Sequence, residues 1–415
     1  GIRDYKVTGV QTCALPIFMS VQIQAQIIVC DICEIKSIQK GINQANAFDT
    51  VLISTGIYNE FDILIDKPIT LIGEELSVID GEKQGSILKV QSDYVHIYDL
   101  HLYRVGLSHT SEYAAIHISD SENFILKNIV VEDAFFGFLI EGSKNGLIID
   151  NVLSGKSDQE FYSGNGIHGW KSDSLTITNN HVSNLRDAIY LEFVGNSTVE
   201  YNISEQNIRY GLHFMFSNHN SYRENIFRQN GAGVAVMFSK FIEMRDNVFE
   251  SNWGTASFGL LLKEIYDAEI EGNTFHENTV AISVEGSTRI NYRNNIFSQN
   301  GWAVKMSGGC YTNAFSNNSF SNNSFDLSFN SRLNDNHFTG NYWSSYNGYD
   351  LDKDGIGDVP HRPVKLFSYV VNRTPESIVL LRSIFVDLIN FTENVTPIFT
   401  PVELIDESPL MEVPS

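Results

Sequence analysis

The sequence predicts an all-β fold, a right-handed, single-stranded parallel β-helix of about ten or more coils, with a short capping helix before it and a helical tail behind it. Two repeated features support this prediction. Asn recurs beside apolar residues with spacings of 22 to 29 residues, at Asn128, Asn151, Asn180, Asn202, Asn225, Asn247, Asn273, Asn295, Asn318 and Asn341. A small residue opens an alternating strand in each repeat, at Ala115, Gly137, Gly166, Ala188, Gly211, Gly233, Gly259, Ala281 and Ala303. Leucine-rich repeats would need a Leu scaffold, and propeller blades need about 40 residues each.

Composition narrows the class of protein further. The chain has 415 residues, and 28 Lys and Arg against 50 Asp and Glu leave a formal net charge of −22. This charge disfavours nucleic acid and anionic membrane surfaces as partners and favours cations. Between Asn128 and Asn347, 32 of 220 residues are Asn, which indicates a turn-dense β-structure because Asn weakens helices. No apolar run approaches the roughly 18 residues that a bilayer-spanning helix needs.

The N-terminal residues stand outside the repeat. Residues 1–18 share no pattern with the rest and resemble translated sequencing-adapter read-through, so we leave them out of the fold. Residues 19–26 could be the remnant of a signal peptide, with Ala25 near the cleavage point. Cys30 and Cys33 form a C-x-x-C that fits a local disulfide, a thiol metal site or coincidence. Cys310 is expected to be buried or at an edge.

The β-helix is predicted over residues 27–346. A short helix over residues 37–45, with Ser37 as its N-cap and Ile38 and Ile42 facing inward, would cover the N-terminal end. The aromatic residues Tyr342, Trp343 and Tyr346 would cover the other end. Insertions before Gly166 and Gly259 are expected as loops on one face. The repeated Asn should take the left-handed turn conformation and hydrogen-bond along the axis.

Alternation within each strand assigns the two faces. The predicted inward positions are Ile116, Ile118, Phe138, Ile140, Ile189, Leu191, Phe193, Leu212, Phe214, Phe216, Val234, Val236, Phe238, Leu260, Leu262, Ile282, Val284, Val304 and Met306. The first outward position of each strand carries His117, Leu139, His168, Tyr190, His213, Ala235, Leu261, Ser283 and Lys305. The second carries Ser119, Glu141, Trp170, Glu192, Met215, Met237, Lys263, Glu285 and Ser307.

The middle coils of this outward column carry residue types that suit a soft metal. Thioether and imidazole ligands together suit Cu(I). Met215 and Met237 should lie on adjacent coils about 4.8 Å apart, close to the roughly 4.6 Å that two sulfur ligands of one ion span. The predicted copper ligands are His213, Met215, Met237, His168 and Glu192. The alternatives are an amphipathic contact surface for a partner, with Trp170 and Tyr190 in it, and ordinary surface.

Residues 347–363 form an Asp- and Gly-rich closing loop. Asp350, Asp352, Asp354 and Asp358, with Gly355 among them, match the first nine positions of a calcium-binding loop. His361 stands where the acidic twelfth ligand would be. The loop therefore predicts either a weak Ca²⁺ site or a tight turn that closes the rod.

The tail, residues 364–415, departs from the repeat. Thr374 and Pro375 predict a helix start. Apolar residues then recur at helical spacing, at Ile378, Leu381, Phe385, Leu388 and Ile389. The helix either folds back on the rod or docks on a partner or a membrane component through Leu381, Phe385 and Leu388.

Several segments together resemble the NosD family, the periplasmic copper-handling proteins of nitrous oxide reductase maturation. They are GNGIHGWKS, DAIYLEF, RYGLHFMFSN, GAGVAVMFSK, FGLLLKE, GNYWSSYNGYDLDKDGIGDVPHRPVKLFS and LLRSIFVDL. The resemblance runs from about Ile27 to Leu410. It implies a pectate-lyase-like parallel β-helix, a periplasmic location, and partnership with a NosF/NosY-type ABC transporter, a NosL-type copper chaperone and nitrous oxide reductase. It provides no firmly assigned catalytic residue.

The resemblance and the residues together favour a non-enzymatic maturation factor with copper as a transient cargo and membrane contact only through the transporter. The chain lacks a phosphate-binding Gly-Lys-Ser/Thr loop, so energy would come from the transporter. The alternative is a β-helix polysaccharide lyase or epimerase, or a carbohydrate-binding protein. Such enzymes need clustered carboxylates, whereas Glu141, Glu192 and Glu285 are expected on separated coils. An inert rod is the third option, and the His/Met/Trp residues argue against it.

Overall fold

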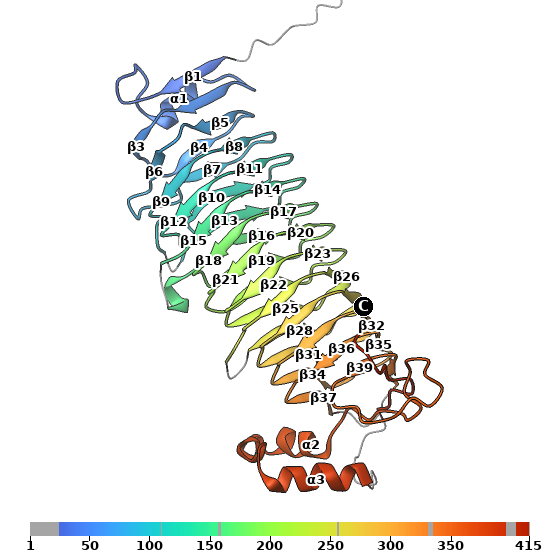
Figure 1. Cartoon of the computed structure of the whole chain (residues 1–415). Coiled ribbons are helices and arrows are strands. Elements are labelled where there is room, and N and C mark those ends of the chain that lie inside the picture. The colour runs from blue at the N-terminus through green and yellow to red at the C-terminus, as the bar shows by residue number, and fades with distance from the viewer. Residues whose placement is uncertain are drawn as a thin grey trace, which may run out of the picture.

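The computed structural model describes residues 25–108, 110–156, 159–254, 257–330, 335–395 and 404–414. Residues 1–18 and 19–24 lie outside this description. The described chain winds into a parallel β-solenoid of about 13 turns, which confirms the predicted fold class. Figure 1 shows the coils stacked along one long axis, with the helical tail at the far end. Three sheets run along the rod, because each coil contributes one strand to each.

The strands of the 14-stranded sheet are β1 (Gln26–Val29), β2 (Thr50–Ile53), β5 (Thr70–Gly73), β8 (His96–Tyr98), β11 (Ile125–Lys127), β14 (Leu147–Ile149), β17 (Thr176–Thr178), β20 (Thr198–Glu200), β23 (Ser221–Arg223), β26 (Lys240–Arg245), β29 (Tyr266–Glu271), β32 (Thr288–Arg293), β35 (Ala314–Ser316) and β38 (His337–Thr339). The strands of the 12-stranded sheet are β4 (Ile63–Ile65), β7 (Leu88–Val90), β10 (Ala114–Ser119), β13 (Phe136–Glu141), β16 (Ile167–Trp170), β19 (Asp187–Glu192), β22 (Tyr210–Met215), β25 (Ala232–Met237), β28 (Phe258–Lys263), β31 (Val280–Glu285), β34 (Trp302–Ser307) and β37 (Phe325–Asn330). The strands of the 13-stranded sheet are β3 (Gly56–Asn59), β6 (Ser77–Asp80), β9 (His101–Tyr103), β12 (Val130–Glu132), β15 (Val152–Ser154), β18 (His181–Ser183), β21 (Ile203–Glu205), β24 (Ile226–Arg228), β27 (Val248–Glu250), β30 (Thr274–His276), β33 (Ile296–Ser298), β36 (Ser319–Ser321) and β39 (Tyr342–Trp343). The helical segments are α1 (Ile38–Gln44), η1 (Glu160–Tyr162), α2 (Leu366–Arg373), η2 (Pro375–Leu380) and α3 (Ile384–Val395).

The coils are in register, so residues one repeat apart become vertical neighbours. Met215 pairs with Met237 across β22 and β25, and His213 pairs with Ala235 on the same two strands. The small residue of each repeat sits second in its strand of the 12-stranded sheet, except Gly166, which comes directly before β16. At Gly233 a Cβ atom would lie 2.4 Å from the carbonyl oxygen of Gly259, so the close approach of the coils requires glycine there.

The core fills the inside of the solenoid with stacked apolar rings. Phe249, Phe275, Phe297 and Phe320 stack in sequence with ring centroids 4.5, 5.1 and 4.7 Å apart. All four rings are fully buried. Replacing one of them with Ala would cost about 3–5 kcal/mol of folding free energy.

A buried Asn ladder runs the length of the repeat. The side-chain amide of each Asn donates to the side-chain oxygen of the next over 2.8 to 3.0 Å, from Asn151 through Asn180, Asn202, Asn225, Asn247, Asn273, Asn295 and Asn318 to Asn341. This confirms the predicted axial hydrogen bonds.

The predicted left-handed conformation of these Asn is wrong, because the residue before each takes it, as at Asn179 with φ 55° and Glu224 with φ 51°. Asn128 is the exception. It holds the left-handed position itself, and Ile129 stands in the ladder position.

A second buried Asn ladder lies at another corner of the coil, and the sequence reasoning missed it. It links Asn207, Asn230, Asn252, Asn278, Asn300 and Asn323 one coil at a time through their backbone N–H groups and side-chain oxygens. A fixed spacing of five residues behind the first ladder was the available signal, since Asn202 and Asn207 or Asn225 and Asn230 recur together.

The two ends are closed differently. At the N-terminal end, α1 packs on β1, β2 and β4, and the Ser37 side chain accepts a hydrogen bond from the Lys40 N–H, as predicted. At the C-terminal end, Trp343 stacks on Phe320 at 4.1 Å. A returning segment adds a feature that the sequence did not reveal. The carboxylate of buried Asp406 accepts hydrogen bonds from the side chains of Asn341 and Trp343, both at 3.0 Å, and so ends the first Asn ladder.

The tail is not one helix from Thr374 to Ile389, which corrects that prediction. The Thr374 side chain makes no capping hydrogen bond, and Pro375 opens a 3₁₀ segment that ends before α3 begins. The tail folds back on the rod through one face, and docking on a partner stays a prediction. Phe367 of α2 packs against Phe325 of β37, and the cluster includes Val386 and Leu381. The other face of α3 is exposed, at Ile384, Phe385, Leu388 and Phe391.

Across the described ranges, every helix is too short or too polar to span a lipid bilayer.

Candidate functional site

The candidate site lies on the outer side of the 12-stranded sheet, over β16, β19, β22 and β25. Register pairing places His168, Tyr190 and His213 in one vertical column. It places Trp170, Glu192, Met215 and Met237 in the column beside it. The second column is half-exposed, but the first is mostly buried, including His168 and His213. The prediction of a fully solvent-facing stripe is therefore wrong for the first column, because its rings cover one another.

The rings of the first column form a stack. Phe136 contacts His168 with ring centroids 5.8 Å apart, and Tyr190 lies 4.8 Å from His168 and 4.7 Å from His213. Tyr210 approaches His213 from the side at 4.9 Å. His168 and His213 are two coils apart, because Tyr190 lies on the coil between them. The Tyr190 ring is inserted between the two imidazoles, so they do not face a common point.

A buried ion pair supports His213. The Asp187 side chain is fully buried, and Arg209 donates to its two oxygens over 2.8 and 2.5 Å. The same carboxylate lies 3.4 Å from His213 Nδ1. Burial alone would raise the pKa of Asp187, but the hydrogen bonds from Arg209 and the close approach of His213 bring that pKa below its usual value. The carboxylate is therefore charged and fixes the edge of the imidazole that faces it.

His168 and Tyr190 of the column are held neutral. Burial, helped by the nearby Arg186 charge, lowers the pKa of His168 to about 4. Burial and the charge of Glu192 raise the pKa of Tyr190 to about 12. A neutral imidazole is the form that can donate a lone pair to a metal ion.

The ligand set fits a soft cation in its chemistry. Both nitrogens of His213 and Nε2 of His168 are buried without a hydrogen bond to any residue in the described part of the chain. Met215 and Met237 stand in register about one strand spacing apart, and His213 lies two residues from Met215 on the same strand. Glu192 follows on the next coil below Met215. The structure brings His213, Met215 and Met237 together, and it separates His168 from them by the Tyr190 coil.

Three phenylalanines beside this site contradict the predicted alternation. Phe193, Phe216 and Phe238 were expected inside, but they are 47%, 39% and 36% exposed. Each follows the last residue of its strand and has φ of 54°, 50° and 53°, so the chain turns and the side chain leaves the core. A left-handed conformation costs about 1–2 kcal/mol for a residue with a Cβ atom. The rings stack on one another with centroids 5.1 Å apart in both steps.

A surface cavity of about 590 Å³ borders the lower end of the ring column. The insertion before Gly166 supplies Glu160 and Phe161 to it, and Phe136 links it to His168. Arg186 lines it while donating to Asn165 Oδ1 at 3.2 and 3.1 Å. Burial and Glu141 raise the pKa of Glu112, which also lines the cavity.

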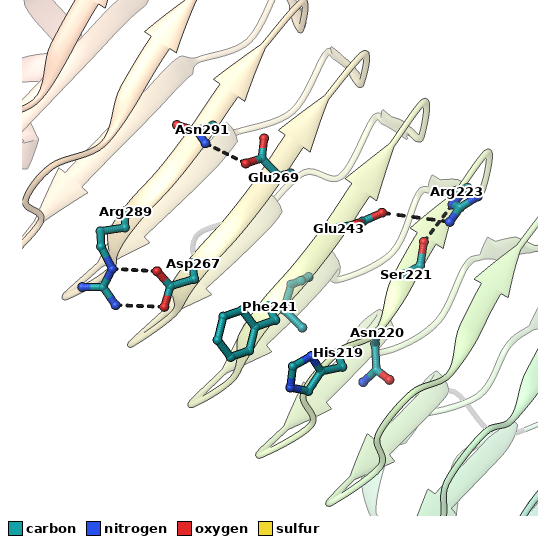
Figure 2. A pocket seen from close by; sticks show the side chains of 11 residues that line it. His219, Asn220, Ser221, Arg223, Phe241, Glu243, Asp267, Glu269, Arg289 and Asn291 are labelled. Atoms are coloured by element: carbon teal, nitrogen blue, oxygen red, sulfur yellow. Dashed lines mark hydrogen bonds and ion pairs between the residues drawn. The ribbon is translucent and has the colours of Figure 1, made fainter.

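A second hollow of about 560 Å³ lies on the 14-stranded sheet and is shown in Figure 2. Its charged groups are largely paired with each other. Arg289 donates to Asp267 over 2.6 and 2.9 Å, and Asn291 donates to Glu269 over 2.6 Å. Figure 2 also shows His219 and Phe241 side by side, with ring centroids 4.6 Å apart. Self-paired charges leave little for a ligand to satisfy, so this hollow is not the candidate site.

The carboxylates that a polysaccharide enzyme would need are spread out. In the second column, Trp170 separates Glu141 from Glu192, and Met215, Met237 and Lys263 separate Glu192 from Glu285.

The Asp-rich loop has its carboxylates close together. Ligand oxygens of Asp350, Asp352 and Asp354 all lie within 4.8 Å of one another. Asp350 also accepts the Lys353 and Gly355 N–H groups over 2.6 and 3.0 Å, and Asp358 accepts the Leu351 N–H at 2.7 Å. The same groups therefore hold the turn, and calcium binding there stays a prediction.

Three cysteines lie in the described part of the chain. Cys30 and Cys33 form a disulfide, which removes them as thiolate metal ligands. Cys310 is buried and unbonded to another cysteine, as expected.

Comparison with known proteins adds to this geometry. Residues 156–348, which include the whole candidate site, match the family described as "Periplasmic copper-binding protein (NosD)". The "Probable ABC transporter binding protein NosD" of Stutzerimonas stutzeri is 26% identical over 371 residues, covering 85% of this chain and 84% of that protein. The chain is therefore similar to NosD proteins over most of its length. The protein of the same name from Pseudomonas aeruginosa is 25% identical over 401 residues, and the match covers 85% of this chain and 86% of that one.

Solved structures share the fold of this chain at low identity. The A-module of the mannuronan C-5 epimerase AlgE6 of Azotobacter vinelandii has a TM-score of 0.59 at 12% identity, covering 74% of this chain and 96% of that one. An α-1,3-glucanase from Streptomyces thermodiastaticus has a TM-score of 0.60 at 14% identity, and the match covers 74% of this chain and 65% of that one. A family 28 exopolygalacturonase of Yersinia enterocolitica has a TM-score of 0.56 at 11% identity, covering 77% and 78%. These similarities establish the β-helix and carry no activity with them.

Proposed function

We propose that this chain is a periplasmic, non-enzymatic accessory protein that holds copper in transit during maturation of the copper site of nitrous oxide reductase. It works with a NosF/NosY-type ABC transporter and receives Cu(I) from a NosL-type copper chaperone. The family description supports copper and the periplasm, and the names of the relatives support an ABC transporter as partner.

The observation that carries the proposal is the in-register pair of Met215 and Met237 with His213 beside it. Two thioethers on adjacent coils and one imidazole form a three-ligand set of the kind that suits Cu(I). Asp187 holds the Nδ1 edge of His213, which leaves Nε2 as the ligand atom. Because few strong ligands are gathered, the ion is held for transfer rather than locked in place.

The tail supplies the contact with the transporter in this proposal. Leu381 faces α2, whereas Phe385 and Leu388 lie on the exposed side of α3 together with Ile384 and Phe391. An exposed apolar helix face of this kind is typical of a protein–protein contact. Trp170 and Tyr190 keep their proposed place at the edge of the copper site, where Lys171 covers the Trp170 ring at 4.2 Å.

The copper part is tested by Cu(I) affinity in competition with a chelator. The triple variant His213→Ala/Met215→Ala/Met237→Ala should bind Cu(I) at least tenfold more weakly than wild type. The matched control is His219→Ala/Met411→Ala, which removes a His and a Met from surface positions away from the column. Equal affinity of the triple variant and wild type would refute these ligands.

The role in maturation is tested in cells that lack this chain. Wild type and the control variant should restore the copper content of nitrous oxide reductase, and the triple variant should not. The tail is tested by Phe385→Glu/Leu388→Glu, which should abolish co-purification with the transporter. Leu351→Glu, at a still more exposed apolar position in the Asp-rich loop, is its control. Release of unsaturated sugar from uronate polymers would instead favour the lyase alternative.

A further inference from the structure

The ladder of Phe193, Phe216 and Phe238 is exposed, although its backbone conformation disfavours such residues. All three hold φ near 50°, where other coils at the equivalent turn carry Gly142, Gly286 and Gly308 or the polar residues Asp120, Lys171 and Glu264. A bulky side chain in this region is an outlier, and outliers of this kind concentrate at functional sites. Here the three outliers are consecutive, and they follow Glu192, Met215 and Met237 directly in the chain.

We propose that this Phe ladder is the docking surface for the protein that delivers Cu(I), and that this partner presents an apolar face edged with carboxylates. The inference rests on the proposed function, because a donor must bring its own ligands to the ion at Met215 and Met237. An apolar contact next to the sulfur atoms would exclude water during transfer.

The geometry of the rings favours a protein over a sugar. Neighbouring ring planes are inclined by only 8° and 14°, so each ring covers the face of the next and presents its edge to solvent. Sugars stack on ring faces, whereas ring edges interdigitate with the apolar side chains of a protein surface.

Charge complementarity identifies the rim of the partner. Three lysines border the ladder and the methionine pair in a chain whose net charge is −22: Lys171 holds the turn position one coil before Phe193, Lys240 follows Phe238 by two residues, and Lys263 pairs with Met237. Glu192 and Glu264 lie at the same border. Within the described ranges, none of these three ammonium groups has an ion-pair partner within 4.0 Å, and two of them rest on the aromatic rings of Trp170 and Phe241. Unpaired lysines at the border of the apolar Phe ladder complement a partner protein that carries carboxylates around an apolar surface of its own.

The test uses Phe193→Asn/Phe216→Asn/Phe238→Asn, because Asn tolerates the left-handed conformation and should preserve the fold. The matched control is Phe48→Asn, which replaces a 43% exposed Phe with φ 70° near the opposite end of the rod. Three measurements are compared: Cu(I) affinity against a chelator, binding of the copper-free NosL-type chaperone, and the rate of Cu(I) transfer from the loaded chaperone.

The triple variant should keep the chelator-measured affinity, while chaperone binding and transfer rate each fall at least tenfold. Phe48→Asn should change neither chaperone binding nor the rate of Cu(I) transfer. Lys171→Glu/Lys240→Glu/Lys263→Glu should slow chaperone association, and the effect should shrink as salt is raised. Unchanged binding and transfer in the Phe variant would overturn the proposal, as would a wild-type dimer that dissociates in that variant. If wild type takes no Cu(I) from the chelator yet binds the chaperone through the ladder, the proposed copper site fails and the docking surface stands.

Discussion

The buried ion pair beside His213 allows a sharp test of how the site is held. We consider Arg209→Met, which keeps a long side chain and removes the charge. Arg209 donates to the Asp187 carboxylate over 2.8 and 2.5 Å, and that carboxylate has no exposed surface. After the change, the only remaining partner is His213 at 3.4 Å. Loss of one member of a buried pair typically costs about 3–5 kcal/mol, because the other charge stays buried. Since Arg209 itself is 36% exposed, we expect the low end, about 3 kcal/mol.

The measurement is urea unfolding followed by tryptophan fluorescence, with the double variant Asp187→Asn/Arg209→Met alongside. If a stranded carboxylate causes the loss, the double variant should be more stable than Arg209→Met alone, by more than about 1 kcal/mol. The control is Arg289→Met, which breaks an ion pair of the same geometry one repeat apart on the surface of the 14-stranded sheet. The free energy of unfolding of Arg289→Met should be close to that of wild type. An Arg209→Met protein as stable as wild type, or a double variant less stable than both single ones, would refute the reasoning.

Three further predictions follow from the rod itself. Asn225→Ala leaves the buried Asn202 N–H and the Val199 carbonyl without their hydrogen-bond partner, so the free energy of unfolding should fall by about 2–4 kcal/mol. The surface variant Asn294→Gly should leave the free energy of unfolding nearly unchanged in the same urea titration. Burial and Lys365 lower the pKa of His361 to about 4, so the unfolded chain binds the extra proton below pH 6.5. His361 should therefore contribute a loss of about 3 kcal/mol in unfolding free energy as pH falls from 6.5 to 4, beside a similar contribution from His168. His361→Phe should remove the His361 contribution alone, while His219→Phe keeps the full dependence. Asp406→Ala should expose the last coils to faster amide hydrogen exchange, and uniform exchange along the rod would contradict its role as the ladder end.

The repeat could be predicted from the sequence because its period is carried by residues with one physical role each. An Asn that bonds the next coil and a small residue that lets backbones approach must recur at every turn, so their spacing reveals the solenoid and its register. The same spacing correctly placed Met215 above Met237. It also placed the two insertions on one side, since both lead into strands of the 12-stranded sheet, β16 and β28.

Features that depend on a single coil, or on residues far apart in the chain, could not be predicted from the repeat. Phe193 continues the apolar alternation of β19, and only its positive φ turns it outward. Asp187 and Arg209 sit 22 residues apart, and neither residue type distinguishes a buried pair from a surface pair. Asp406 lies 65 residues beyond Asn341, in a segment with no repeat to indicate where it returns. The left-handed residue was assigned one position late, because Asn is common both there and in the ladder.

The tail and the proposed copper site both lie on the 12-stranded sheet, so the distance between them decides whether two partners can bind the rod at once. The α2 helix packs on β37, the last strand of the 12-stranded sheet, and Asn372 bonds Ser328 of that strand. Met237 lies on β25, and β28, β31 and β34 lie between it and β37. At about 4.8 Å per strand, the methionine pair is roughly 19 Å along the axis from the strand that anchors the tail. A transporter held at α3 and a donor held at the Phe ladder would therefore occupy separate stretches of one face. The two contacts are then independent, so Phe385→Glu/Leu388→Glu should leave chaperone binding unchanged, and the Phe ladder variant should still co-purify with the transporter.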